Sequence, residues 1–299
     1  MFNKYITAVL LGFVALSAKA QVNIQQQITN IAKDAKGIVS FTALNLETRD
    51  SISYHGEGQM VMQSVMKFPI ALAVLHEVER GKFNLDEKFK ISDRDMHHKN
   101  GPLFEKYPKG LNIPLSELLT YMVSYSDNNA CDILLDKIGG VKPVMDNLRR
   151  LGVKGIVVDA SELDMASAWE VQYTNWCKPA SMVQLLDVFY QGKALDKANT
   201  DTLMKKMLQA TTGPKQIKGL LPQGTAVAHK TGRSNTNAEG VTAATNDVGI
   251  ITLPNGQHLA IAIFIGNSTA DLDTRERVIA QLAKTVWDVN VAAKPQGAK

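Results

Sequence analysis

The order of the apolar patterns constrains the fold of this sequence most, because strand-like segments near both ends enclose a long helical middle. Five short segments are rich in β-branched or alternating apolar residues, which is typical of strands. They are residues 37–46, 51–54, 225–230, 247–253 and 259–266. The last two are separated by Pro254-Asn255-Gly256, a strong hairpin signal. We therefore predict one antiparallel sheet made from both ends of the chain.

The middle of the chain has its apolar residues at helical spacing. The segments are 67–80, 114–125, 130–137, 142–151, 179–190 and 200–208, with a further one at 274–289 after the last strand. The predicted class is α+β: an antiparallel five-stranded sheet flanked by terminal helices, plus an all-α domain. We expect an α/β lobe from residues 21–62 and 216–299 and an all-α lobe from residues 63–215. A ligand site is expected in the cleft between the lobes.

The first twenty residues have the pattern of a cleaved secretory signal peptide. Lys4 precedes an apolar run from Ile6 to Leu16, and Ala18-Lys19-Ala20 is the small-x-small pattern that signal peptidase recognises. The alternative is a membrane anchor, but the run is too short to span a bilayer as a helix. We therefore predict that residues 1–20 are removed and that the mature chain is secreted or periplasmic, without stable insertion in a membrane.

The charge pattern argues against nucleic acid as a partner. The chain has 33 Lys and Arg against 29 Asp and Glu, a net charge of +4. This mild excess is not gathered into the basic runs that follow a phosphate backbone.

The cysteines and histidines show no metal-binding pattern. Cys131 and Cys177 are too few for a zinc site built on cysteine, and they either form a disulfide or stay as small buried residues. The histidines lack metal-ligand spacing, and the adjacent His97 and His98 point to opposite faces in most conformations. We expect His229 to face away from the cleft because it alternates with Lys230 along a strand. No metal or other cofactor is expected.

The first chemical motif is Ser64-Val65-Met66-Lys67, at the start of an apolar helical run. This spacing puts the Ser64 hydroxyl and the Lys67 ammonium on one helix face, which suits a serine nucleophile with a lysine that manages its proton. Taken alone, the pattern equally fits a capping serine and a solvated lysine.

Two further motifs follow in order along the chain. Ser126-Asp127-Asn128 lies between two predicted helices, and Lys230-Thr231-Gly232 ends a predicted strand. Each is weak alone, since the first also reads as a helix-capping turn. Together, S-x-x-K, S-D-N and K-T-G form the signature of class A β-lactamases and penicillin-binding proteins.

The chain resembles the class A serine β-lactamases over essentially its whole mature length, and most closely their PER/VEB/CfxA-like subgroup. The resemblance is carried by S-V-M-K-F-P (64–69), Y-S-D-N-N (125–129), V-Q-Y-T-N-W (171–176), T-T-G-P (211–214) and A-A-T-N-D (243–247). It implies that Ser64 is the acylated nucleophile and that Lys67 and Ser126 pass protons. It also implies that Asn128 binds the substrate amide, and that Lys230 and Thr231 hold the substrate carboxylate.

The substrate-binding strand is expected to continue through Gly232, Arg233 and Ser234. The backbone N–H of Arg233 should join that of Ser64 in an oxyanion hole. The Arg233 guanidinium either assists the substrate carboxylate, replacing an arginine that relatives carry at the position of Gln216, or points to solvent. Arg275 is another candidate for carboxylate recognition, but we expect it to be a solvated surface charge.

The resemblance places the general base for deacylation at Glu162, on an Ω-shaped loop. Asp164 and Glu170 are nearby competitors; Asp164 has the shorter reach and Glu170 lies nearer the end of the loop. The loop departs from the common family pattern, because Ala160 and Asn175 replace the arginine and aspartate that tie its neck. Ala166 replaces an asparagine that helps fix the hydrolytic water. These changes predict a loop held in another way and a wider cleft, suited to bulky cephalosporins.

The expected function is hydrolysis of penicillins and cephalosporins through a serine acyl-enzyme, by a monomer acting on β-lactam antibiotics. Two alternatives share the motifs. One is a D-alanyl-D-alanine peptidase or transpeptidase with a long-lived penicilloyl-enzyme, and the other is a β-lactam-binding module without turnover.

Overall fold

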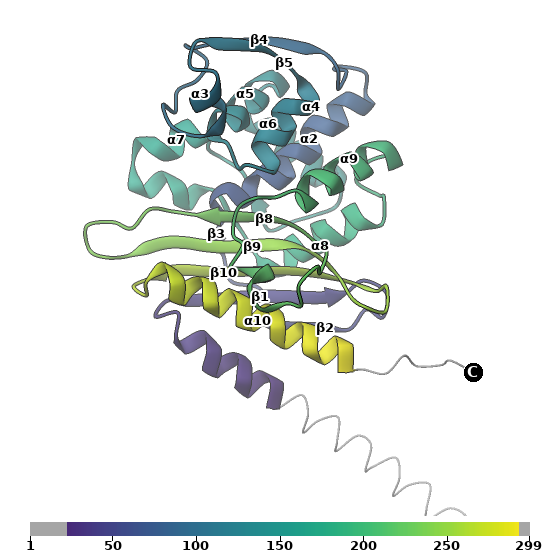
Figure 1. Cartoon of the computed structure of the whole chain (residues 1–299), viewed down its shortest axis with the longest axis vertical. Helices are drawn as coiled ribbons and strands as arrows, with labels where there is room; N and C mark the ends of the chain where they lie inside the picture. The colour runs from purple at the N-terminus through teal and green to yellow at the C-terminus, as the bar shows by residue number, and fades with distance from the viewer. Residues whose placement is uncertain (1–22, 293–299) are drawn as a thin grey trace, which may run out of the picture.

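The computed structural model describes residues 23–292, so the predicted signal peptide lies outside the described residues. Its centre is a five-stranded antiparallel sheet in the order β2-β1-β10-β9-β8 (Figure 1). The strands are β1 (Ile38–Asn45), β2 (Ser51–Tyr54), β8 (Val227–Arg233), β9 (Thr242–Thr252) and β10 (His258–Ser268). Strand β1 pairs directly with β10, so the two ends of the chain share one sheet, as predicted.

Both faces of the sheet are covered. Along β10, Ile261, Ile263 and Ile265 belong to one apolar cluster, whereas Ala260, Ala262 and Phe264 belong to another. This alternation follows from the two-residue period of a strand with both faces buried. The first cluster includes side chains of α10 (Leu272–Ala292) and of the helix at residues 23–33, which cover the outer face (Figure 1).

The inner face carries the helical part of the chain. Helix α8 (Pro179–Tyr190) packs on β1 and β10. Helix α2 (Lys67–Glu79) is buried on all sides from Lys67 to Leu75, as expected of a helix that is apolar all round. It contacts four helices: α4 (Leu115–Val123), α5 (Asn128–Ile138), α6 (Val141–Arg150) and α9 (Lys197–Leu208). The predicted α+β class is confirmed, and each predicted helix lies within a few residues of an observed one.

Several short elements were not predicted, because two to six residues are too few for a periodic pattern. One group is the hairpin of β4 (Lys88–Ser92) and β5 (Gly110–Pro114), with α3 (Pro102–Lys106) between them. Another is a small sheet of β3 (Met60–Val61), β7 (Trp176–Cys177) and β6 (Ile156–Val157). The others are the helical turns η1 (Gln63–Met66), α7 (Glu162–Ser167), η2 (Trp169–Thr174) and η3 (Ile217–Leu220). The small sheet joins the segment before Ser64 to the segments on both sides of α7.

The two cysteines are free thiols, which decides between the alternatives left open by the sequence. Cys131 and Cys177 are both buried, and burial raises the pKa of each thiol well above its usual value.

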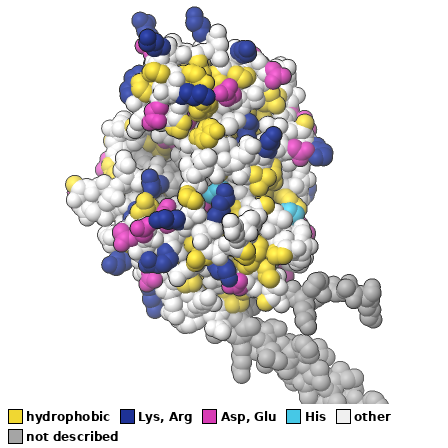
Figure 2. Space-filling view, in the orientation of Figure 1, with side chains coloured by type: hydrophobic (Ala, Val, Ile, Leu, Met, Phe, Trp, Pro, Cys, Tyr) yellow, Lys and Arg dark blue, Asp and Glu magenta, His cyan; other side chains and the backbone are white. Residues whose placement is uncertain are grey.

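The surface carries charges of both signs. Figure 2 shows Lys and Arg side chains spread over this face among acidic and apolar ones, without a continuous basic stripe. No helix within residues 23–292 is long and apolar enough to cross a bilayer.

Candidate active site

Ser64 is the second residue of η1, which leads directly into α2. The preceding residue, Gln63, has φ = 48°, a left-handed conformation that L residues adopt rarely and that is often found at functional sites. Met62 donates its N–H to the Asn175 carbonyl at 2.9 Å and so anchors this turn. Ser64 is therefore held on a short turn at the start of a buried helix, with its side chain partly exposed.

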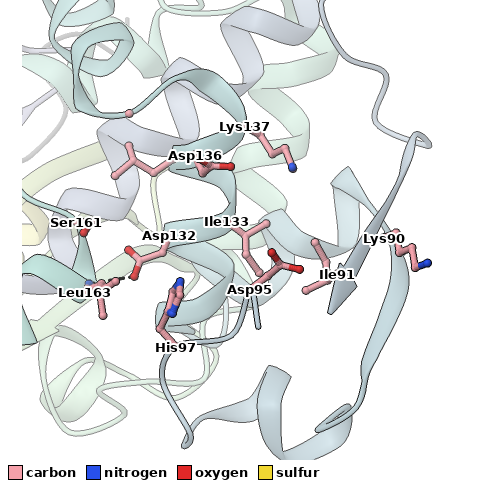
Figure 3. Close-up of a pocket in the computed structure, with 12 residues that line it drawn as sticks. Lys90, Ile91, Asp95, His97, Asp132, Ile133, Asp136, Lys137, Ser161 and Leu163 are labelled. Carbon is pink, nitrogen blue, oxygen red and sulfur yellow. Dashed lines mark hydrogen bonds between the residues drawn. The ribbon is translucent and has the colours of Figure 1, made fainter. Parts of the chain in front are cut away.

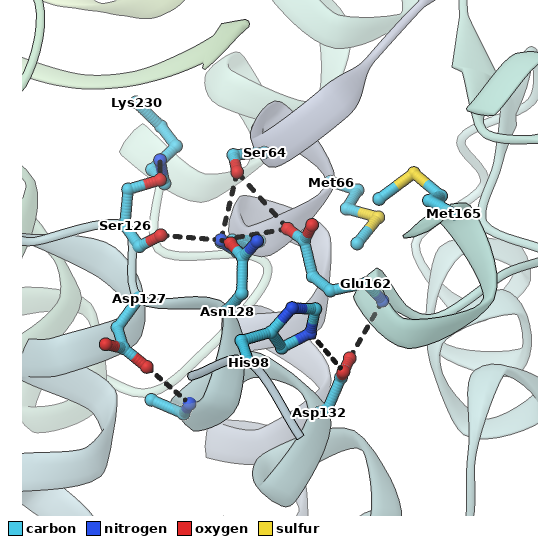
Figure 4. A network of polar contacts seen from close by, with 12 residues as sticks. Ser64, Met66, His98, Ser126, Asp127, Asn128, Asp132, Glu162, Met165 and Lys230 are labelled. Carbon is cyan, nitrogen blue, oxygen red and sulfur yellow. Dashed lines mark hydrogen bonds and ion pairs between the residues drawn. The ribbon is translucent and has the colours of Figure 1, made fainter. Parts of the chain in front are cut away.

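Figure 4 shows Ser64, Asn128 and Glu162 close together in a polar network. The fully buried Lys67 joins these three side chains. Its Nζ lies 2.9 Å from Ser64 Oγ and 2.9 Å from Glu162 Oε1. It also donates to the Ser126 carbonyl at 2.7 Å and to Asn128 Oδ1 at 2.6 Å. A buried ammonium needs this number of acceptors to offset the loss of water. The structure thus brings Ser64 and Lys67 together as their spacing predicted.

Ser126 stands in a left-handed conformation, with φ = 61°, in the turn between α4 and α5. Asp127 fixes this turn, because its carboxylate caps α5 through the Ala130 N–H and also accepts the Leu103 N–H, each at 2.8 Å. The Ser126 hydroxyl then faces Lys230, whose Nζ donates to Oγ at 2.7 Å.

Lys230 lies on β8, the edge strand of the sheet, and is fully buried. Burial, together with the neighbouring ammonium of Lys67, lowers the pKa of Lys230 to about 7. An anionic ligand would favour its charged form. Next along the strand, the Thr231 hydroxyl lies 2.7 Å from that of Thr212.

Gly232 allows β8 to lie against the turn that carries Ser64. A Cβ here would press on the Met62 carbonyl oxygen and would come within 3.2 Å of the Ser64 nitrogen. Ser234 donates its N–H to the Ala244 carbonyl of β9 at 3.0 Å and accepts the Ala244 N–H at its hydroxyl. Because successive N–H groups of a strand point in opposite directions, the Arg233 N–H faces the open edge, toward the cleft.

Of the three carboxylates proposed from the sequence, the structure places Glu162 at Ser64. Glu162 is the first residue of α7 and is 5% exposed, and Ser64 Oγ donates to its Oε1 at 3.2 Å. Asp164 instead forms a capping box with Ser161, and its side chain is exposed. Glu170 is also exposed.

Comparison with known proteins agrees with this geometry. The family model described as "Beta-lactamase enzyme family" matches residues 23–289. The chain is 39% identical over 291 residues to β-lactamase VEB-1 of Pseudomonas aeruginosa, covering 95% of this chain and 97% of the relative. It is 36% identical over 284 residues to extended-spectrum β-lactamase PER-1 of the same species, covering 94% and 92%. A crystal structure of a β-lactamase from Chitinophaga pinensis superposes with a TM-score of 0.88 at 45% identity, covering 90% of this chain and 99% of that one.

The chain belongs to the class A β-lactamases, in their PER/VEB-like group. This confirms the resemblance found in the sequence and identifies a β-lactamase rather than a peptidase or a binding module.

The Ω loop of this β-lactamase is tied at its neck by Asn175, which is fully buried. Its Oδ1 accepts the N–H groups of Asp159 and Ala160 at 2.7 and 3.0 Å, and its Nδ2 donates to the Ala160 carbonyl at 2.8 Å. One amide side chain thus closes the neck with three bonds to backbone. A fourth tie links Gln63, beside the nucleophile, to Gln172 of η2 at 2.7 Å.

The expectation for Arg275 is wrong. Arg275 is only 5% exposed, since it lies in α10 against the sheet and donates to Thr245 Oγ1 at 2.8 Å and to the Ala270 carbonyl. Burial lowers the pKa of its guanidinium. The expectation rested on the rule that single charged side chains are usually solvated, and the sequence does not show which helix face the sheet covers.

The other candidate for carboxylate recognition, Arg233, is the last residue of β8 and is exposed. Gln216, at the position where the resemblance expects an arginine, is 3% exposed and lies beside Gly213. His229 faces the side opposite Lys230, as predicted. It is fully buried there with Asp247, whose Oδ1 lies 2.9 Å from Nδ1.

Sequence reasoning missed two residues of this β-lactamase that lie behind Glu162. Asp132 accepts the N–H groups of Glu162 and Leu163 at 2.8 and 3.0 Å, and His98 contacts the same carboxylate (Figure 4). A signal for Asp132 existed, because it follows Asn128 by one helical turn and so shares its face of α5. His98 had none, because its partner is distant in the chain.

Proposed function

We propose that this enzyme confers resistance by hydrolysing the β-lactam ring of penicillins and cephalosporins through an acyl-enzyme on Ser64, which a water activated by Glu162 then releases. One observation carries the proposal: Ser64 Oγ lies within hydrogen-bond distance of both Lys67 Nζ and Glu162 Oε1. An ammonium and a carboxylate thus converge on one partly exposed hydroxyl, the proposed nucleophile.

In the acylation step, Ser64 Oγ attacks the lactam carbonyl carbon. The new C–O bond forms and the lactam C–N bond breaks. The Oγ proton enters the pair of Lys67 and Glu162, while the leaving nitrogen takes a proton from the Ser126 hydroxyl, which Lys67 replenishes. The net result moves one proton from Oγ to nitrogen.

The negative charge that develops on the carbonyl oxygen needs fixed donors. In this proposal the backbone N–H of Ser64 and the cleft-facing N–H of Arg233 form an oxyanion hole, and the close approach allowed by Gly232 supports this assignment.

In the deacylation step, Glu162 takes a proton from water, the hydroxyl adds to the ester carbonyl, and the C–O bond to Ser64 breaks. Oγ regains its proton and the product leaves as the ring-opened acid. The burial of Glu162 beside Lys67 supports this role, because the carboxylate faces the same oxygen that carries the acyl group.

Substrate recognition is assigned to the edge of β8 and to Asn128. The Lys230 ammonium and the Thr231 hydroxyl bind the substrate carboxylate, with Gly232 and Ser234 along the same strand and the exposed Arg233 guanidinium assisting. Asn128, whose Oδ1 is held by Lys67, binds the amide side chain. The relative PER-1 is described as an extended-spectrum enzyme, and we propose that bulky cephalosporins are accepted here too.

The remaining assignments rest on the sequence pattern. Residues 1–20 direct export to the periplasm, and the mature enzyme acts as a monomer without a metal or organic cofactor. Its site lies between a lobe of residues 21–62 and 216–299 and a lobe of residues 63–215.

The test is turnover of a chromogenic cephalosporin by the purified mature enzyme, with Ser64→Ala as the matched variant. We expect many turnovers per wild-type molecule, and neither turnover nor covalent labelling by a fluorescent penicillin in Ser64→Ala. A labelled Ser64→Ala protein would overturn the assignment of the nucleophile.

A further inference from the structure

His98 lies directly behind the carboxylate that supports Glu162. Its Nε2 is 3.1 Å from Asp132 Oδ2, and both side chains are nearly buried, at 12% and 10% exposure (Figure 4). A carboxylate can only accept hydrogen bonds, so Nε2 must carry the proton and donate it.

Asp132 in turn holds the start of α7. Its Oδ1 accepts the backbone N–H of Glu162. Its Oδ2 accepts both the backbone N–H of Leu163 and the ring Nε2–H of His98. The side-chain orientation of Asp132 therefore sets the position of the backbone from which the Glu162 side chain extends toward Ser64.

His98 is itself fixed in place. The side chain of the fully buried Asn129 accepts the backbone N–H of His98 at 2.9 Å and donates to the backbone carbonyl of His98 at 2.7 Å. The backbone of His98 is thus anchored to α5, three residues before Asp132, and its imidazole is only 12% exposed.

We propose that His98 is a positioning residue for deacylation, because its hydrogen bond fixes the Asp132 carboxylate that orients Glu162. The inference rests on the proposed role of Glu162 and adds a residue that does not touch the substrate.

The charges around His98 agree with this role. The groups that face it are Asp132 of α5, Glu162 of α7 and Lys67 of α2. The bond to Asp132 raises the pKa of His98, and Glu162 adds to this effect. Both carboxylates favour the protonated imidazole, whereas burial and the Lys67 ammonium oppose it.

The chain offers a matched control in the adjacent His97. Its side chain is exposed and lines a hollow of about 310 Å³ together with Asp132, Asp136 and Leu163 (Figure 3). Within the described residues only His98 of the two imidazoles bonds to Asp132, so His97→Ala removes the same kind of side chain one residue away and leaves the bonds of Asp132 in place.

The experiment compares His98→Ala, His98→Gln and His97→Ala by single-turnover acylation and by intact-mass measurement of deacylation. Loss of a hydrogen bond to a charged group should slow deacylation by about tenfold in His98→Ala, with acylation within about twofold of wild type. His98→Gln retains an N–H at a similar reach and should restore deacylation to within about threefold of the wild-type rate. His97→Ala should match wild type.

Hydrogen exchange at the Glu162 and Leu163 amides gives a readout that does not depend on the reaction. Exchange at both should rise in His98→Ala and not in His97→Ala. Unchanged deacylation and exchange in His98→Ala would overturn the inference, as would an equal fall in acylation and deacylation with a lowered melting temperature. If Glu162→Gln itself accumulates no acyl-enzyme, the proposed function fails. The exchange result still decides whether His98 stabilises the backbone at Glu162 and Leu163.

Discussion

Replacing Asn175 with alanine should destabilise the Ω loop of this enzyme. The change removes three hydrogen bonds of 2.7 to 3.0 Å to the backbone of Asp159 and Ala160. Asp159 is exposed, so water can satisfy its N–H, whereas Ala160 is 4% exposed and loses a partner at both its N–H and its carbonyl. Each buried backbone group left without a partner costs about 1–3 kcal/mol. Partial relaxation or entry of water lowers the sum, so we expect a loss of about 2–4 kcal/mol.

The assay is thermal unfolding together with deacylation. A loss of this size corresponds to a fall in Tm of roughly 5–15 °C for an enzyme of this length. Because the loop carries Glu162, deacylation should also slow by about tenfold or more, while acylation changes less. The matched control is Thr174→Ala, whose exposed hydroxyl makes one local bond to the Val171 carbonyl and should change stability by less than about 0.5 kcal/mol. A melting temperature and deacylation rate in Asn175→Ala equal to those of Thr174→Ala would refute the argument that this amide holds the loop.

Three other substitutions test separate parts of the site. Because the pKa of Lys230 is about 7, its ammonium is lost as pH rises through that value, so kcat/KM for substrates with a carboxylate should fall. Lys230→Arg stays charged and should lack this basic limb in its pH profile, and an unchanged limb would assign it to another group. Gly232→Ala should slow acylation by at least about tenfold with the fold intact by circular dichroism, since the new Cβ displaces β8 from Ser64; wild-type acylation would contradict the oxyanion-hole assignment. Asp164→Asn should leave deacylation within about twofold of wild type, because this carboxylate faces Ser161, and a large loss would move the base from Glu162 to Asp164.

The long elements were predictable from the sequence because their burial repeats along the chain. Helix α8 has the predicted bounds, residues 179–190, since its apolar face extends over three turns. Strand β9 begins at Thr242, ahead of the predicted 247, because the polar residues Thr242, Thr245 and Asn246 conceal a strand whose side chains are buried. Their burial is made possible by partners elsewhere, such as the carbonyls of Val61 and Met62 for Asn246.

The motif residues Ser64, Lys67, Ser126 and Lys230 were identified because each belongs to a short local pattern, and the structure brings their side chains together. Asp132 and His98, which lie behind Glu162, were not identified, because their effect comes from tertiary contacts. Asn175 was noted only as a departure from the family pattern, although its amide replaces the missing tie.

The central claim, that Glu162 activates the water that releases the acyl-enzyme from Ser64, is tested most directly by intact-mass spectrometry of Glu162→Gln mixed with a cephalosporin, beside the wild-type enzyme. Glutamine keeps the size of the side chain but cannot take the proton from water. The account predicts that Glu162→Gln accumulates a stable adduct on Ser64 while wild type shows turnover and little acylated mass. Wild-type turnover in Glu162→Gln, without an adduct, would contradict the account and place the base elsewhere.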